Sequence, residues 1–265
     1  MCNITIKTLL RQLHPIKGFV YDSARLAPDH SKTLLVEVRE REGSLGRCSG
    51  CKRKSPGYDR LATRKWSFIP LCALAVFIVY APRRVDCRRC GVTVEMVPWA
   101  TGKMQICEVF RLFLAQWARH LSWAEVANVF NVAWADVYGA VKWVVDFGIQ
   151  NRDLSGVTAL GVDEVHVGKK DKFWTLVYQI DGHCKRLLWI GNDRTEATFD
   201  HFFEIFGEEF CKGIRFLCSD MWKPYLNAAA YWLPNALHIL DPFHIVKKLN
   251  EAIDDIRRAE SRARA

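Results

Sequence analysis

The sequence predicts a multidomain α/β protein with an N-terminal zinc-binding module, a helical segment and an α/β domain. Two Cys-x-x-Cys pairs lie in the first hundred residues, helical periodicity follows them, and short β-rich runs begin near Leu160. At 265 residues and 50% hydrophobic content, the chain is long enough to bury the cores of several modules. We place the domain boundaries at 1–100, 101–155 and 156–265.

The positive charge is concentrated at the N-terminal end of the chain. Residues 1–100 hold 18 Lys and Arg against 8 Asp and Glu, whereas the remaining residues are close to neutral within a net charge of +9. A basic module joined to a neutral one indicates a polyanion-binding part and a part with another task. The alternative is a basic surface that only improves solubility.

Hydropathy and the N-terminus argue against membrane insertion and secretion. The longest apolar run, residues 68–82, is shorter than the roughly 20 residues of a spanning helix and holds a proline near each end. The N-terminus lacks the uninterrupted apolar core of a signal peptide. We therefore expect a globular cytoplasmic protein with no membrane partner. The spacing of four of its ten cysteines argues for metal binding rather than disulfides, and the other six are most simply small core residues.

The two cysteine pairs, Cys48 with Cys51 and Cys87 with Cys90, have the spacing of zinc knuckles. A two-residue gap lets both sulfurs turn toward one tetrahedral ion at about 2.3 Å. The 35 residues between the pairs exceed the usual spacing, so the intervening chain should form a structure of its own. Its alternating pattern over 65–82 predicts a hairpin that brings the pairs together. Thiol redox chemistry is the alternative for either pair alone.

Cationic side chains surround both cysteine pairs, where they can meet the phosphates of a nucleic acid. They are Lys52, Arg53 and Lys54 after the first pair and Arg83, Arg84, Arg88 and Arg89 around the second. An ordinary solvated face is the alternative interpretation of these charges.

The middle segment predicts three helices. Residues 104–121 repeat apolar side chains at intervals of three and four. A capping-box pattern starts a second helix at Ser122, and after a break at Asn131 a third helix covers 134–145. Helix, turn and helix is the layout of a helix-turn-helix motif. Lys142 is the single cation of residues 134–145, so a plain helical hairpin is the competing interpretation.

The last segment predicts an α/β sheet. Three β-rich runs form an antiparallel meander, and helix, strand, helix, strand and helix then follow. This order favours a sheet whose first strand is central and lies beside the fourth. The predicted strands cover about 159–168, 173–181, 186–191, 213–220 and 236–241, and the predicted helices 194–210, 221–233 and 243–265.

Two aspartates lie at the predicted junction of the first and fourth strands. Asp163 is in the first strand and Asp220 ends the fourth. Carboxylates on neighbouring strands can share magnesium while leaving its other positions open to water and phosphate oxygens. Metals held in this way serve phosphodiester displacement. The alternative is that both aspartates only accept hydrogen bonds from loop amides.

The order of these motifs resembles the bacterial insertion-sequence transposases of the ISL3 family over nearly the whole chain. Its most specific segments are "SDMWKPY", "LPNA" and "DPFHIVKKLN". The resemblance implies a ribonuclease-H-like catalytic domain that cuts and joins DNA ends with magnesium held by an Asp, Asp, Glu triad. The first two members of the triad match Asp163 and Asp220, and the zinc-finger cysteines match Cys48, Cys51, Cys87 and Cys90.

The third carboxylate of the triad has no match before Ala265. Family chains run further, and their glutamate follows a helical insertion, so the resemblance implies a fragment whose catalytic domain is incomplete at the C-terminus. Asp255 is an alternative third ligand because it follows Asp220 by 35 positions, although its neighbours look like a charged helix face. Asp241 is expected to support the site together with His244.

The expected function is that of a transposase that binds the terminal inverted repeats of its element. It would use Zn²⁺ for structure and Mg²⁺ for catalysis, act as a homo-oligomer and associate with the nucleoid. The alternative is a non-catalytic, zinc-dependent DNA-binding protein derived from a transposase, and an unstable fragment is a third possibility.

Overall fold

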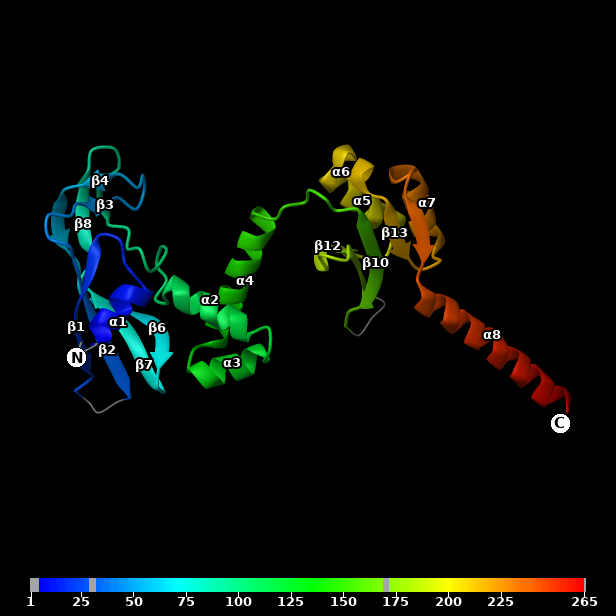
Figure 1. Cartoon of the computed structure of the whole chain (residues 1–265), viewed down its shortest axis with the longest axis horizontal. Helices are drawn as coiled ribbons and strands as arrows, with labels where there is room; N and C mark the ends of the chain where they lie inside the picture. The colour runs from blue at the N-terminus through cyan, green and yellow to red at the C-terminus, as the bar shows by residue number, and fades with distance from the viewer. Residues whose placement is uncertain (1–4, 29–31, 169–171, 265) are drawn as a thin grey trace. The chain divides into compact units, whose positions relative to one another are not determined.

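The computed structural model describes residues 5–28, 32–168 and 172–264. The chain divides into two compact units, Met1–Arg152 and Asp153–Ala265 (Figure 1). Each unit has its own hydrophobic core. The mixture of helices and several sheets confirms the multidomain α/β class, whereas the ribonuclease-H-like assignment and the three domain boundaries stay predictions.

A four-stranded sheet lies at the centre of the first unit. Its strands, in spatial order, are β1 (Phe19–Leu26), β2 (Thr33–Glu40), β7 (Leu74–Tyr80) and β6 (Arg64–Leu71). β2 and β7 are parallel, and the other two pairings are antiparallel. The hairpin predicted over 65–82 is confirmed as β6 and β7, and it extends this sheet. The helix α1 (Ile6–Leu13) precedes the sheet.

Five short strands carry the cysteine pairs. β3 (Gly46–Arg47) pairs with β4 (Lys54–Ser55), and a second small sheet has the order β5 (Gly57–Arg60), β8 (Arg83–Cys87) and β9 (Gly91–Val94). The chain therefore leaves the first cysteine pair, passes through the β6–β7 hairpin and returns to the second pair. Val85 and three of the cysteines form a small separate core there.

Three helices complete the first unit, and they are α2 (Glu108–Trp117), α3 (Trp123–Phe130) and α4 (Trp134–Gln150). The predicted capping box at Ser122 is confirmed. Asn131 ends α3 in the left-handed conformation (φ 49°, ψ 52°), which turns the chain directly into α4. Phe110, Val126 and Val137 of the three helices share one core with the four-stranded sheet.

The second unit is built on a five-stranded sheet. Its spatial order is β12 (Arg186–Asn192), β11 (Phe173–Gln179), β10 (Ala159–His166), β13 (Phe216–Ser219) and β14 (Leu237–Leu240). β10 to β12 form the predicted antiparallel meander, and β13 and β14 continue in parallel with β10. The prediction of a central first strand beside the fourth is confirmed.

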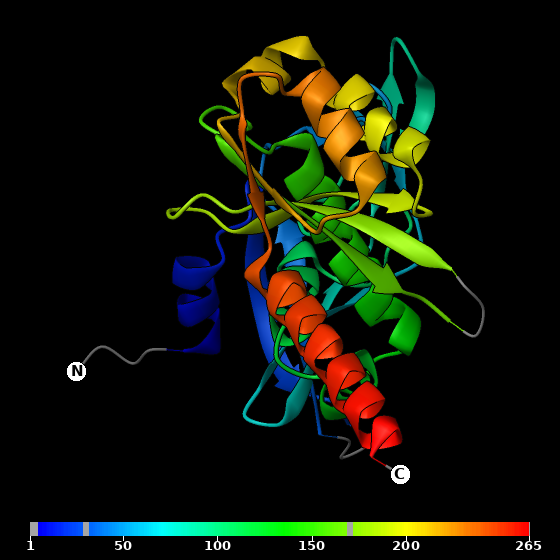
Figure 2. The same cartoon turned by 90° about the vertical axis from the view of Figure 1, so that its right-hand side faces the viewer.

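Helices cover one face of this sheet, and α5 and α7 lie side by side (Figure 2). The helices of the unit are α5 (Glu196–Phe206), α6 (Glu208–Gly213), α7 (Lys223–Trp232) and α8 (Pro242–Ala263). The single helix predicted over 194–210 is wrong, because Gly207 (φ 80°) separates α5 from α6. α8 has no buried residue. Within the described ranges, no helix is long and apolar enough to cross a membrane.

Candidate metal centres and nucleic-acid interface

The four predicted zinc ligands come together in the first unit. Cys48 and Cys51 lie in the turn between β3 and β4, whereas Cys87 is the last residue of β8 and Cys90 lies in the turn before β9. All four sulfurs lie within 4.8 Å of one another, with 3.5 Å between Cys51 Sγ and Cys87 Sγ. Thiolates at about 2.3 Å from one tetrahedral ion would lie about 3.8 Å apart, so the set fits zinc.

The surroundings of two of these sulfurs favour the thiolate form, which is the form that binds metal. A hydrogen bond from Thr93 and backbone N–H groups lower the pKa of Cys48 to about 6. Backbone N–H groups also lower the pKa of Cys87. A hydrogen bond with Cys51, burial and the neighbouring Cys48 raise the pKa of Cys90 to about 12.

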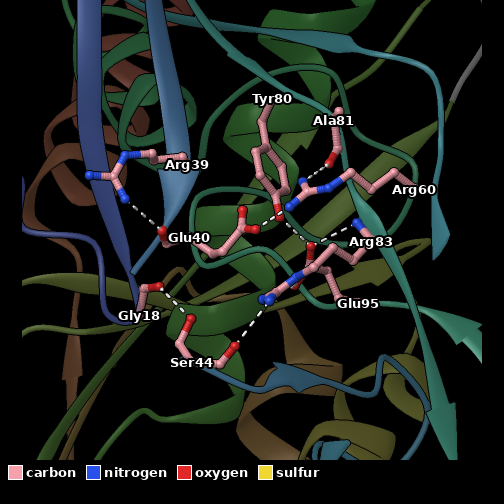
Figure 3. Close-up of polar contacts among 9 residues, drawn as sticks. All are labelled: Gly18, Arg39, Glu40, Ser44, Arg60, Tyr80, Ala81, Arg83 and Glu95. Atoms are coloured by element: carbon pink, nitrogen blue, oxygen red, sulfur yellow. Dashed lines mark hydrogen bonds and ion pairs between the residues drawn. The ribbon is translucent and has the colours of Figure 1, made fainter. Parts of the chain in front are cut away.

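A buried ion pair joins the zinc module to the four-stranded sheet (Figure 3). The Glu95 side chain is 1% exposed and accepts hydrogen bonds from the Tyr80 hydroxyl (2.5 Å) and from Arg83 Nη2 (2.8 Å). Arg83 also donates to the Ser44 carbonyl (3.0 Å). Burial and the neighbouring Glu95 raise the pKa of Tyr80. Arg83, predicted to contact DNA, therefore has its guanidinium group directed into the protein.

The other predicted DNA-binding cations differ in whether they form an ion pair with an acidic side chain. Arg84 pairs with Asp59 and lies over the Tyr58 ring, and Lys142 pairs with Asp146 at 2.5 Å. Over the described part of the chain, no ion pair involves the five remaining predicted cations, which are all exposed. They are Lys52, Arg53, Lys54, Arg88 and Arg89.

The helical segment has the helix-turn-helix layout, but the start of α4 is aromatic rather than cationic. Trp134 and Tyr138 are exposed by 53% and 44%, and their rings stack at 5.7 Å. Arg111 of α2 is buried and holds α4 through the Gly139 carbonyl (3.1 Å) and the Trp143 ring (4.5 Å).

Asp163 and Asp220 lie at the same edge of the five-stranded sheet. Gly161 of β10 is opposite Cys218 of β13, and continuing this parallel register by two residues brings Asp163 opposite Asp220. Asp163 Oδ1 accepts the N–H of the next residue (2.8 Å), and Asp220 Oδ1 accepts the Trp222 N–H (2.9 Å). One oxygen of each carboxylate therefore has a local partner.

A glutamate and an arginine that the sequence analysis missed lie beside this pair. Arg194 Nε is 2.6 Å from Glu164 Oε1, and Arg194 Nη2 is 3.7 Å from Asp220 Oδ2. The guanidinium group also lies over the rings of Trp222 (4.6 Å) and Phe173 (5.8 Å). Two features of the sequence could have identified them. Glu164 directly follows an expected metal ligand, and Arg194 follows the third predicted strand.

Glu164 and Asp163 point to opposite faces of β10 because side chains alternate along a strand. Leu160 and Val162 of β10 belong to the core under the helices, and Glu164 continues their face. Burial raises the pKa of Glu164, and a hydrogen bond from Tyr225 of α7 and the charge of Arg194 partly offset that effect.

The two further predicted aspartates lie on α8. Asp241 caps this helix by accepting the Phe243 N–H (2.9 Å), and its Oδ2 is 3.8 Å from His244 Nε2. Asp255 lies further along the helix, where its side chain is 78% exposed and pairs with Arg258. In the described ranges, the four cysteines form the only group of three or more potential ligands close enough to hold one ion.

Comparison with known proteins identifies the second unit. The DDE-type family model ISL3, described as "Transposase", matches residues 160–265. Residues 160–265 are an ISL3-type transposase domain. The predicted family is thereby confirmed, and the matched part of the transposase domain includes Asp163, Asp220, Asp241 and Asp255.

Two relatives extend the similarity into the first unit. The transposase for insertion sequence element IS1557 of Mycobacterium tuberculosis is 30% identical over 236 residues, which cover 88% of this chain and 52% of the relative. The transposase for insertion sequence element IS1001 of Bordetella parapertussis is 23% identical over 253 residues, or 95% of this chain and 62% of the relative. The chain thus spans about half the length of the first of these relatives.

Proposed function

We propose that the chain functions as an insertion-sequence transposase, with a DNA-binding first unit and a second unit that supports metal-dependent DNA strand cleavage and transfer. The observation that supports this proposal most strongly is the parallel pairing of β10 with β13, whose last paired residues, Gly161 and Cys218, precede Asp163 and Asp220 by two positions each. Rigid neighbouring strands can hold two carboxylates at a fixed separation, as a shared metal requires. Both aspartates lie within residues 160–265, which match the transposase family model, and this match is the reason for assigning DNA strand chemistry to the pair.

The sheet supports a ribonuclease-H-like assignment for the second unit. Three antiparallel strands followed by two parallel ones, with the first strand central, is the order expected for that fold from the family resemblance. β10 and β13 are neighbours within this sheet. We therefore propose that residues 156–265 contribute the first part of the catalytic domain.

We assign Mg²⁺ to Asp163 and Asp220 and Zn²⁺ to the four cysteines. Carboxylate oxygens suit magnesium, whereas a tetrathiolate set suits zinc. Bound magnesium would supply activation of the attacking oxygen and stabilisation of the leaving oxygen in phosphodiester displacement. The residues of the chain orient this centre, because the N–H groups of Glu164 and Trp222 each fix one carboxylate oxygen.

The proposed partner is the DNA of the terminal inverted repeats. The five exposed cations of the zinc module can contact phosphates directly, whereas Arg84 and Lys142 would first have to leave their carboxylate partners. Arg83 would act indirectly by holding the module together. We further propose a homo-oligomer as the active form, and a cytoplasmic, nucleoid-associated location.

A non-catalytic DNA-binding protein is the second candidate function. The observation that favours it is the position of Asp255, which lies exposed on α8 with Arg258 as its ion-pair partner. Within the described ranges, no third carboxylate joins Asp163 and Asp220 in a group close enough to share one ion. A DNA-binding protein would need the zinc module but not the aspartate pair.

A cleavage and binding assay separates the two functions. Labelled DNA with the terminal repeats is incubated with zinc-loaded protein and Mg²⁺ or Mn²⁺, and Asp220→Asn is compared with Asp255→Asn. Cleavage that is lost in Asp220→Asn and kept in Asp255→Asn would support the transposase. Salt-sensitive binding without cleavage would support the DNA-binding protein, and no binding at all would contradict both.

A further inference from the structure

Arg194 brings a positive charge to the two carboxylates nearest the proposed magnesium site. We propose that Arg194 is a built-in counter-cation, which holds Asp220 in the metal-free protein and releases it to a divalent cation while staying paired with Glu164. This inference rests on the proposed function, since it assumes that Asp163 and Asp220 bind the metal. It assigns Arg194 and Glu164 as positioning residues.

The two contacts of Arg194 are unequal. Its Nε atom lies 2.6 Å from Glu164 Oε1, whereas its Nη2 atom lies 3.7 Å from Asp220 Oδ2. The Glu164 side chain is 12% exposed and the Asp220 side chain 20% exposed, so the contact with Glu164 is also the better shielded from water. A competing cation would therefore displace the guanidinium group from Asp220 before it separates Arg194 from Glu164.

The chain holds Arg194 in place at some conformational cost. The preceding residue, Asp193, has a backbone φ angle of 113°, which residues other than glycine rarely adopt. Its N–H donates to the Phe173 carbonyl (2.9 Å), and its carbonyl accepts from the Thr175 hydroxyl (2.8 Å). Backbone strain of this kind persists where the surrounding structure fixes it, and it is common at functional sites.

Electrostatics explain why the site needs a counter-cation. Asp163, Glu164 and Asp220 bring three carboxylates to this part of the sheet, and Arg194 lies beside the last two. Arg194 relieves part of the repulsion among them without a metal. Once a divalent cation binds Asp163 and Asp220, the same guanidinium group repels it, so Arg194 should weaken metal binding.

Glu164 lies on the opposite face of β10 from Asp163, which argues against its being a ligand of the same ion. Its carboxylate instead gives Arg194 a second partner, away from Asp220. Removing Glu164 should leave Arg194 with Asp220 as its one remaining carboxylate partner, and should strengthen that pairing. Arg194 and Glu164 are thus expected to affect metal affinity in opposite directions.

The test measures Mn²⁺ binding to the zinc-loaded full chain by electron paramagnetic resonance of the free ion. We expect Arg194→Gln to bind Mn²⁺ about ten-fold more tightly than the wild type, the order expected for removal of one nearby charge. Glu164→Gln should bind it several-fold more weakly. The matched control is Arg215→Gln, which removes an exposed arginine at the other end of β13 and should change nothing.

The double variant Arg194→Gln/Glu164→Gln distinguishes positioning from ligation. If Glu164 acts only through Arg194 and through its charge, the double variant, which keeps the net charge of the site, should bind Mn²⁺ about as tightly as the wild type, whereas loss of a glutamate ligand would make it bind more weakly than the wild type. The melting temperature provides a check on folding, because Mn²⁺ should raise it more in Arg194→Gln than in the wild type.

The outcomes also separate this inference from the proposed function. Wild-type binding that Asp220→Asn abolishes, together with unchanged or weaker binding in Arg194→Gln, would overturn the role of Arg194 and leave the proposed metal site standing. Absence of Asp220-dependent binding in both the wild type and Arg194→Gln would overturn the metal site and this inference together.

Discussion

Among the individual residues, the four clustered cysteines are the expected zinc ligands, whereas Cys72 lies outside that set. We expect Cys48→Ser to lower bound zinc well below one ion per chain, because it removes a buried sulfur of the four-cysteine set. Cys72→Ser is the control, since Cys72 is exposed in the turn between β6 and β7. Metal analysis of protein purified without chelator measures both, and equal zinc in the two variants would contradict the assignment.

Substitutions of Arg83 and Arg88 should affect the stability of the protein and its DNA binding differently. Arg83→Ala leaves Glu95 buried without its charge partner, so we expect a loss of about 3–5 kcal/mol in the free energy of unfolding. Arg88→Ala should change that free energy by less than about 0.5 kcal/mol, because Arg88 is exposed.

The same variants should differ in DNA affinity. Loss of one phosphate contact in Arg88→Ala should reduce the salt slope of the binding constant by about 1. Urea unfolding and fluorescence anisotropy provide the two measurements. An Arg83→Ala protein as stable as the wild type would rule out the structural role that we assign to Arg83.

Contacts between residues were predictable from sequence only where a spacing motif marks both partners. The spacing of the cysteine pairs identified residues that do come together. The partner of Arg83 is 12 positions away and reaches it through the pairing of β8 with β9, and Arg194 meets Glu164 across 30 positions. Local patterns contain no information on such contacts, which depend on the register of strands.

Among the secondary-structure elements, α1 is attached to β1 through a residue sensitive to pH. The Tyr21 hydroxyl donates to the His14 carbonyl (2.9 Å) and lies 2.7 Å from His14 Nδ1. Burial lowers the pKa of His14 below its usual 6.5. The unfolded chain therefore takes up the proton first, and this contribution to stability is lost as the pH falls from about 6.5 through the folded-state pKa.

We expect His14→Gln to reduce the dependence of the free energy of unfolding on pH between 7.5 and 5.5. Urea unfolding of the full chain at the two pH values measures it. His120→Gln removes an exposed histidine of the same unit and serves as the control. If His14→Gln and the wild type lost equal stability over this range, burial of His14 would not be the cause.

Element boundaries were predictable where a local signal decides them. The capping box at Ser122 and the hairpin of β6 and β7 follow from neighbouring residues alone. The break at Gly207 was missed because the apolar period continues across it, and the rings of Phe206 and Phe210 still pack at 4.9 Å. Only the positive φ of the glycine ends α5 there.

The whole chain consists of two units joined by a segment without regular structure, residues 151–158. Because each unit has its own core, we expect limited proteolysis to cut first in this segment and to leave two folded fragments. Mass spectrometry identifies the cut sites. Earlier cleavage inside the four-stranded or five-stranded sheet would contradict this division.

Strand order predicted that β10, which contains Asp163, would lie beside β13, which ends one residue before Asp220. The shared core of the four-stranded sheet and the three helices was not predicted, because it joins residues more than a hundred positions apart. Arg194 was missed for the same reason.

Anomalous diffraction from crystals soaked with Mn²⁺ tests the central claim most directly. The account predicts a peak between Asp163 and Asp220 in the wild type, in addition to the zinc peak at the four cysteines, and its loss in Asp220→Asn with the zinc peak retained. A wild-type map without manganese at that position, or an equal peak in Asp220→Asn, would contradict the claim that these two aspartates form the metal site.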